Sequence, residues 1–401
     1  MADTHYDDSH DVHEVTIDEV VTTVIMARVT DFFGFFVYAI ASAVVFPTLF
    51  FPNYAPVTAT LLSFGVFSLA FIARPIASLI GRSLQKKVGR GGKIVIALMV
   101  LGTSTVAIGL LPGYESIGWW APALLAALRF VQGLGLGGAW DGITMQLQSA
   151  APDGRRGFYG MIPQLGGPIG FCVAAALFYV MHGFLTEEEF MNFGWRFAFF
   201  AVMAVNVVSL FARIRLLSAD FGGDSLPPQS APLSEVFSFQ KKPILISTFM
   251  PLAAYSLFHM VTVFPLAYAM LYTDISISEI LLWQMTGGTI GVFTVFFSGW
   301  LSDKIGRPKV LMLGALMTIG LCFTITSLDS QPWVFILAGF ALLGLTHGSS
   351  SAIAPARFLP QYRYSGVAMS TNLSWIFGAA FAPLIGLALT AAFGLWSASL
   401  Y

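Results

Sequence analysis

The sequence predicts an all-α polytopic membrane protein. Of its 401 residues, 56% are hydrophobic and only 10% are charged, and the mean hydropathy is +0.77. Soluble domains carry about 25% charged residues, so water would not solvate a surface of this composition. The apolar runs are continuous rather than alternating, which excludes a transmembrane β-barrel.

Eleven apolar segments have the length of a membrane-spanning helix, which takes about 20 residues. We expect these helices near 23–48, 57–82, 93–112, 119–148, 157–184, 193–215, 243–272, 279–301, 309–328, 333–357 and 364–391. A Pro-, Gly- and Ser-rich stretch follows the sixth helix and is typical of a linker. The expected regions are an acidic tail at 1–22, a six-helix half at 23–215, a linker at 216–242 and a five-helix half at 243–401.

The basic residues predict the orientation. Most of the 20 Lys and Arg residues fall in loops that follow even-numbered helices, whereas the other loops are acidic. Cytoplasmic loops carry the excess of Lys and Arg, so we expect the N-terminus and the linker to be cytoplasmic. The acidic tail lacks the basic start of a secretory signal.

Nothing in the sequence predicts an enzyme, a metal site or a nucleic-acid partner. Cys172 and Cys322 lie in separate apolar segments and are interpreted as packing residues. Three His in the acidic tail match no zinc spacing. The glycine run at 133–138 lies within an expected membrane helix, so it lacks the preceding strand of a dinucleotide site.

Two basic loops repeat one motif. RSLQKKVGR at 82–90 and GWLSDKIGRP at 299–308 share Leu, Lys, Gly and Arg when Gly89 is aligned with Gly306, about half the chain apart. QLGGPIG at 164–170 and APLIG at 382–386 are spaced alike. This periodicity predicts two repeated half-transporters.

The repeated loop resembles a signature of the major facilitator superfamily. Further segments resemble its metabolite:proton symporter family, namely FPTLFFP at 46–52, ARP at 73–75, RFVQGLGLGGAW at 129–140, GWR at 194–196 and RYSG at 363–366. The resemblance implies the major facilitator fold of two pseudo-symmetric helical halves. It also implies a monomer in the bacterial cytoplasmic (inner) membrane, a lipid partner, and a proton as coupling ion with no other cofactor.

The sequence departs from this family at three places. Asp31 matches the first of two usual acids on the first helix, and Gly34 replaces the second. Ala139 replaces an acid on the fourth helix, where Asp141 follows two residues later. The family has twelve helices, whereas we expect eleven spans here, with the twelfth missing.

Ionisable groups within membrane spans are candidates for function. We expect Asp31, Arg129 and Asp141 to take part in proton coupling, with Asp31 and Arg129 as a pair that opens on protonation. The alternative is a static buried pair. Arg74 is a carboxylate ligand or a structural arginine, and Asp141 is a proton relay or the partner of Arg74.

Polar and aromatic residues of the central helices complete the expected substrate site. His259 follows a helix start broken by Pro251, which is typical of a residue lining a pathway, although a structural histidine is an equal alternative. The expected substrate-binding residues are Arg129, Arg74, Tyr38, Gln132, Trp140, Gln164, His259, Tyr268, Asn372 and Trp375.

The repeated loops are expected to gate the transporter. Their candidate gating residues are Lys86, Gly89, Arg90, Asp303, Gly306 and Arg307. In the superfamily the acid of this loop is thought to contact the opposite half, and Lys86 stands where the second copy has Asp303. We expect the reversed charge near Arg363 to favour an inward-open state; the alternative is that Lys86 points to water.

The sequence therefore predicts a secondary active transporter that imports a small organic anion by proton symport with alternating access. The charge of Arg129 and the aromatic helices indicate a carboxylate, with aromatic carboxylates among the candidates. The alternatives are an uncoupled facilitator or exporter of the same fold and a non-transporting membrane sensor or scaffold.

Overall fold

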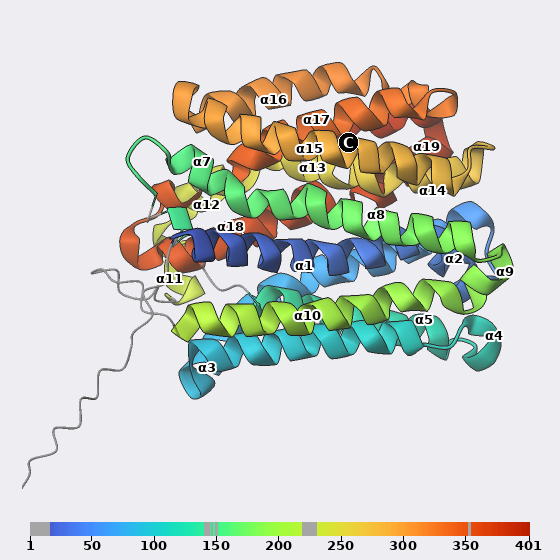
Figure 1. The fold of residues 1–401 in the computed structure, drawn as a ribbon, viewed down its shortest axis with the longest axis horizontal. Coiled ribbons are helices and arrows are strands. Elements are labelled where there is room, and N and C mark those ends of the chain that lie inside the picture. The colour runs from blue at the N-terminus through green and yellow to red at the C-terminus, as the bar shows by residue number, and fades with distance from the viewer. Residues whose placement is uncertain (1–16, 140–144, 146, 149–150, 219–230, 352–353) are drawn as a thin grey trace, which may run out of the picture.

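The computed structural model describes residues 17–139, 145, 147–148, 151–218, 231–351 and 354–401. Long helices run side by side along one direction (Figure 1). In the first part of the chain they are α1 (Ile17–Val44), α2 (Phe46–Phe50), α3 (Pro56–Leu110), α4 (Tyr114–Ile117), α5 (Trp120–Gly138), α7 (Arg156–Met161), α8 (Gly166–Phe184), α9 (Glu187–Glu189) and α10 (Trp195–Ser218).

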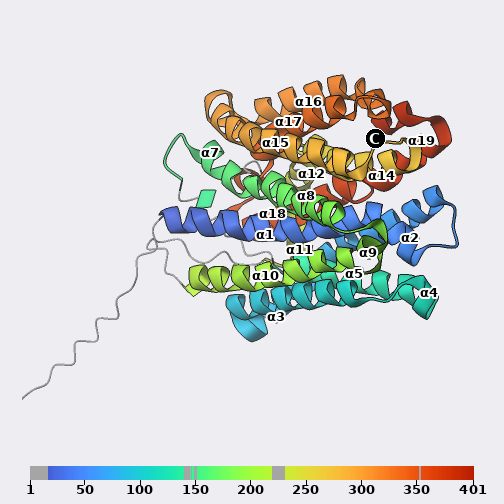
Figure 2. The ribbon, with the colours of Figure 1, turned by 45° about the vertical axis from the view of Figure 1, so that its right-hand side comes forward.

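The second part of the chain begins with a short helix after the linker. Its helices are α11 (Leu233–Phe239), α12 (Lys241–Phe249), α13 (Leu252–Thr262), α14 (Phe264–Tyr272), α15 (Ile277–Ile305), α16 (Arg307–Cys322), α17 (Pro332–Ser350), α18 (Arg363–Ser374) and α19 (Ala382–Phe393). In both views α15, α16 and α17 lie along one side of the bundle and α3 and α10 along the other, with α1 and α18 between them (Figures 1 and 2).

Over the described residues, nine helical stretches are long and apolar enough to cross a membrane. The nine stretches differ from the eleven expected spans at two places. The 55-residue helix α3 covers two expected spans, and its backbone leaves helical geometry at Gly89, between them. The expected span at 309–328 is helical as the 16-residue α16 and is then continued by a 3-10 turn, Ile325–Asp329.

The repeated loop signature has a backbone reason. Gly89 has φ 76° and Gly306 has φ 89°. Residues with a Cβ rarely adopt positive φ, so both copies need glycine where one helix ends and the next begins. The two glycines that align in the sequence therefore share one conformational task in the structure.

The glycine stripe of α5 packs against α3. A Cβ on Gly133 would stand 2.4 Å from the carbonyl oxygen of Ala70, and one on Gly137 would stand 2.5 Å from that of Arg74. The stripe therefore packs against α3 rather than against α1, the helix that carries Asp31. The close approach brings α5 and α3 into backbone contact and sets the position of Arg74 on α3.

We predict that Gly133→Ala lowers the thermal midpoint of the purified protein. The added methyl group must push α3 and α5 apart, and overpacking of this kind costs about 1–3 kcal/mol. Gly183→Ala on α8 is the control, because a Cβ there meets nothing within 4 Å and alanine favours a helix. Equal midpoints for the two variants would show that the contact does not constrain the bundle.

Candidate functional site

A central cavity of about 100 Å³, measured for the centre of a water-sized sphere, lies between the two parts of the bundle. α1, α3, α5 and α10 line it on one side, and α13, α17 and α18 on the other. Its lining extends to Gln148 and Ser351. Ser351 donates a hydrogen bond to the carbonyl oxygen of Gly160 on α7 at 2.7 Å, so the cavity reaches toward the end of the bundle that bears the basic loops.

The charge of this cavity is positive over the described residues. Arg28, Arg74 and Arg213 line it, and Asp31 is the acid among the described lining residues. Three guanidinium groups against one carboxylate leave an excess of two positive charges. A cavity of low dielectric magnifies such an excess.

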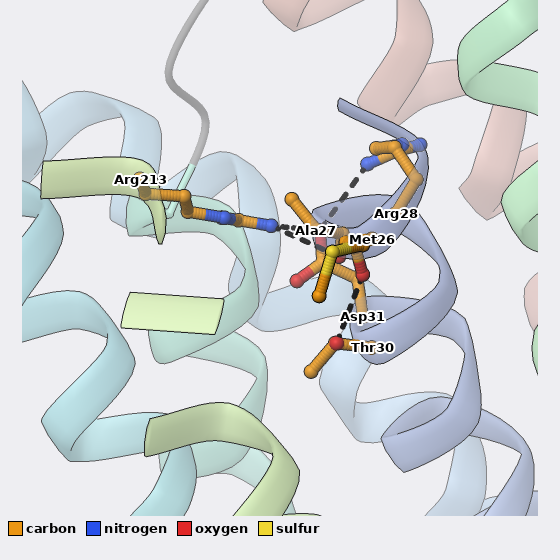
Figure 3. A network of polar contacts seen from close by, with 6 residues as sticks. All are labelled: Met26, Ala27, Arg28, Thr30, Asp31 and Arg213. Carbon is orange, nitrogen blue, oxygen red and sulfur yellow. Dashed lines mark hydrogen bonds and ion pairs between the residues drawn. The ribbon is translucent and has the colours of Figure 1, made fainter. Parts of the chain in front are cut away.

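Asp31 is held by two arginines (Figure 3). Its Oδ2 accepts a hydrogen bond from Arg213 Nη2 at 2.7 Å and lies 3.5 Å from Arg28 Nη1. Arg213 also donates to the carbonyl oxygen of Ala27 at 3.2 Å. Arg213 is 1% exposed, although it stands near the end of the expected helix at 193–215 and is not among the expected site residues. The last turns of α10, which ends at Ser218, carry this arginine inside the bundle.

The expected contact between Asp31 and Arg129 is not present. Arg129 is fully buried, and its Nε and Nη1 donate to the carbonyl oxygen of Phe67 at 3.2 Å and to Gln132 Oε1 at 2.5 Å. Its guanidinium carbon stands 3.7 Å from the centre of the Tyr38 ring. Arg129, Gln132 and Tyr38 thus form a buried cluster behind the central cavity, and none of the three lines it.

Three of the expected substrate ligands do line the central cavity: Arg74, Gln164 and Trp375. The Arg74 guanidinium carbon lies 5.4 Å from the Trp375 ring. Tyr255 and His347 also line it; they were not among the expected ligands because the sequence does not show which face of a helix meets the cavity. Arg28 was missed in the same way, although it precedes Asp31 by one helical turn.

Other expected ligands lie elsewhere. Tyr268 donates a hydrogen bond to Asp329 of the turn between α16 and α17. Asn372 donates to Ser78 Oγ at 3.1 Å, which joins α18 to α3. Neither residue lines the central cavity. Trp140 and Asp141 lie outside the described residues.

A group of rings, here called the aromatic plug, lies beside the cavity. Phe32, Phe35 and Trp375 belong to this plug and also line the central cavity. The other members are Phe36, Phe67, Phe71, Phe258 and His259. His259 is fully buried, with its ring 5.1 Å from that of Phe67 and 5.3 Å from that of Phe35. These rings join α1 and α3 to α13 and to the helical turn after α18. His259 therefore lies in the aromatic plug and not in the central cavity.

The second copy of the loop signature forms a latch across the bundle. Asp303 at the end of α15 accepts hydrogen bonds from the backbone N–H groups of Gly157 and Phe158, at 2.6 and 2.9 Å. Both groups belong to the first turn of α7, where the helix dipole favours an anion. The acid therefore contacts the opposite part of the chain, as the resemblance implies for this position.

The first copy makes a different contact. Lys86 is exposed, and the buried Lys93 instead reaches the start of α18, with its Nζ 3.4 Å from the hydroxyl of Tyr364. A base does face this helix start, but it is Lys93 rather than the expected Lys86. The influence of Lys86 on the inward-open state stays a prediction.

We predict that Asp303→Ala lets the end of α15 separate from the start of α7. The variant loses two hydrogen bonds to a charged group, each worth about 1.5–3 kcal/mol. A single cysteine at Ser350 on α17, with Cys172 and Cys322 replaced by serine, should then react at least about five times faster with a maleimide, since about 1 kcal/mol gives such a factor.

Asp153→Ala is the matched control, because the Asp153 side chain is fully exposed and pairs with Arg156 at 3.8 Å. Exposed pairs contribute little, so the control should label at the original rate. Equal labelling rates with and without Asp303→Ala, both in the single-cysteine background, would show that the Asp303 hydrogen bonds do not hold α15 against α7.

Comparison with known proteins agrees with this architecture. The family model described as Major Facilitator Superfamily matches residues 31–373. An inner membrane metabolite transport protein of Escherichia coli (strain K12) is 35% identical over 397 residues, covering 96% of this chain and 90% of that protein. A shikimate transporter of the same organism is 28% identical over 381 residues, covering 92% and 87%.

A solved structure shares the fold. The crystal structure of a D-xylose–proton symporter superposes with a TM-score of 0.73 at 16% identity, covering 96% of this chain and 95% of that one. At this identity the likeness concerns the fold alone. The helical bundle, its central cavity and the match over most of the sequence agree: this chain belongs to the Major Facilitator Superfamily, whose members are membrane transporters and not enzymes.

Proposed function

We propose that this protein imports a small organic anion together with a proton across the bacterial cytoplasmic membrane. The two halves, 23–215 and 243–401, rock about the central cavity, and the N-terminus and the linker at 216–242 lie in the cytoplasm. The protein acts as a monomer with a proton as its coupling ion. The position of Arg74 in the central cavity carries the anion assignment.

Arg74 has the properties of an anion ligand. It lines the cavity at the seam of the two halves, and its Nε has no hydrogen-bond partner among the described residues. A buried donor without a partner costs about 1–3 kcal/mol. A carboxylate would satisfy it, because the planar guanidinium fork matches the two carboxylate oxygens. A neutral sugar would leave the positive excess of the cavity uncompensated.

The rings beside Arg74 support a carboxylate that carries a ring. Trp375 lies against the Arg74 guanidinium, and Tyr255 lies 4.9 Å from Trp375, ring centre to ring centre. His347 lines the same cavity. Flat apolar faces next to a cation suit a planar or cyclic acid. A relative named as a shikimate transporter fits this chemistry.

Asp31 supports proton coupling. When ionised, it neutralises part of the charge of Arg28 and Arg213. When protonated, it releases both guanidinium groups toward the cavity, which then attracts an anion more strongly. Proton binding and anion binding therefore favour each other, and such reciprocity is the thermodynamic requirement for symport.

We predict that Arg74→Gln abolishes uptake of carboxylates into proteoliposomes. Glutamine keeps a polar side chain but lacks the charged fork. The probe set is radiolabelled shikimate and benzoate as carboxylates, betaine as a zwitterion and xylose as a neutral sugar. Lys87→Gln removes an exposed charge from α3, two residues before Gly89, and should leave uptake unchanged. Transport of xylose or betaine in preference to both carboxylates would refute the anion assignment.

We predict that Asp31→Asn abolishes accumulation driven by a pH gradient but retains exchange of labelled for unlabelled carboxylate. Asparagine has nearly the same size and cannot titrate. Accumulation at the original level would place the proton site elsewhere, with Asp141 as the next candidate. Uptake that never responds to a pH gradient would indicate the uncoupled facilitator, outward movement the exporter, and no transport of any probe the sensor.

A further inference from the structure

A second, much smaller cavity lies between Asp31 and Arg129. Its volume is about 10 Å³, again for the centre of a water-sized sphere. A cavity needs about 10–15 Å³ by this measure to hold one water molecule. Asp31, Phe35 and Leu136 line both this cavity and the central one, so the Asp31 carboxyl group stands at the boundary between them.

Polar atoms without protein partners line the small cavity. Asp31 Oδ1, Arg129 Nη2 and both Oδ1 and Nδ2 of Asn206 on α10 are buried and make no hydrogen bond to the described residues. The neighbouring Thr105 and Gln132 are paired with each other at 2.7 Å. Asn206 is 4% exposed, and leaving such groups unpaired would be costly.

The unpaired atoms match the bonding capacity of water. Asp31 Oδ1 and Asn206 Oδ1 are acceptors, whereas Arg129 Nη2 and Asn206 Nδ2 are donors. One water molecule donates two hydrogen bonds and accepts two, and buried waters typically make about three. The donor and acceptor set around the small cavity is therefore complementary to a single water.

We propose that Asn206 is a positioning residue of the proton site, holding one water molecule that joins the Asp31 carboxyl group to the Arg129 guanidinium. This inference rests on the proposed proton-coupled transport. In this arrangement the Asp31 carboxyl group has two sets of partners. Oδ2 faces Arg213 and Arg28, and Oδ1 faces the water, Asn206 and Arg129. The water supplies a hydrogen bond that stabilises the ionised carboxylate.

Cations face Asp31 from four helices. They are Arg28 of α1, Arg74 of α3, Arg129 of α5 and Arg213 of α10. Arg129 stands behind the water and makes no direct contact with the carboxylate. Besides its through-space attraction for the ionised carboxylate, Arg129 would act on the proton equilibrium through the water and Asn206.

Asn206→Leu tests the proposal with two readouts. Leucine has a similar volume, fills the site and cannot bind water. We expect a lower thermal midpoint, because Asp31 and Arg129 lose their shared partner. We also expect the pH of half-maximal gradient-driven uptake of shikimate or benzoate to rise by about one unit, a tenfold gain in proton affinity, since the ionised carboxylate loses a donor.

Two further variants make the test specific. Asn206→Ser keeps a hydroxyl group and leaves room for a second water, so it should lie between the wild type and Asn206→Leu in both readouts. Ser209→Ala is the control, because Ser209 Oγ on the same helix is also buried and unpaired among the described residues but does not line the small cavity. It should leave the pH of half-maximal uptake unchanged and should not lower the thermal midpoint, because it removes a buried hydroxyl group without a partner.

The results separate this proposal from the proposed function. A higher thermal midpoint for Asn206→Leu would show that the cavity is dry and would overturn the proposal. An unchanged pH of half-maximal uptake, in a protein whose coupling depends on Asp31, would overturn it too. If uptake does not depend on Asp31 at all, the proposed proton coupling through Asp31 is wrong. A lowered thermal midpoint of Asn206→Leu would in that case show that the water is structural only, and its role at the proton site would be overturned.

Discussion

The Asp31 carboxylate is held between two guanidinium groups inside an apolar bundle, and the arrangement of the site depends on this contact. A lone charge within a membrane protein is expensive. The 2.7 Å hydrogen bond from Arg213 compensates it, and the more distant Arg28 adds to the attraction. The contact ties the end of α10 to α1, so the charge state of one carboxyl group affects how two helices of the same half pack. This is the kind of group through which a proton can influence a conformational equilibrium.

The glycine at position 34 fits this arrangement. A Cβ on Gly34 would stand 2.8 Å from Cγ1 of Val202 on α10, so α1 and α10 approach closely one turn after Asp31. The second acid that the resemblance implies at this position would have to displace α10 here. The Asp31–Arg213 pair lies beside this close contact between α1 and α10.

Much of the fold follows from the sequence because hydrophobic length, basic loops and the repeated glycine signature are local properties. Asp31, Arg74, Gln164 and Trp375, which line the central cavity, are recognisable as candidates because polar and aromatic groups in central helices stand out. Their partners are not recognisable in this way. Arg213 lies near the end of an apolar segment and therefore resembles a loop base, although α10 carries it inside the bundle.

The same limit explains the wrong partner for Arg129. The spacing of Gly133 and Gly137 shows that one face of α5 lacks side chains at these positions, but it does not show which helix packs on that face. The structure brings α3 there, and Arg129 then reaches Phe67 and Gln132. A pairing between helices that are distant in the sequence depends on the packing of the whole bundle, which a single sequence does not reveal.

Infrared difference spectroscopy across a pH titration, on the protein in lipid, tests the central claim most directly. If Asp31 is the titrating carboxyl group at the cavity, the wild type should gain, as the pH falls, a carboxylic C=O band in addition to those of the exposed acids. That band should be missing from Asp31→Asn. The same band in the wild type and in Asp31→Asn would contradict the account, because the proton would then bind to another group.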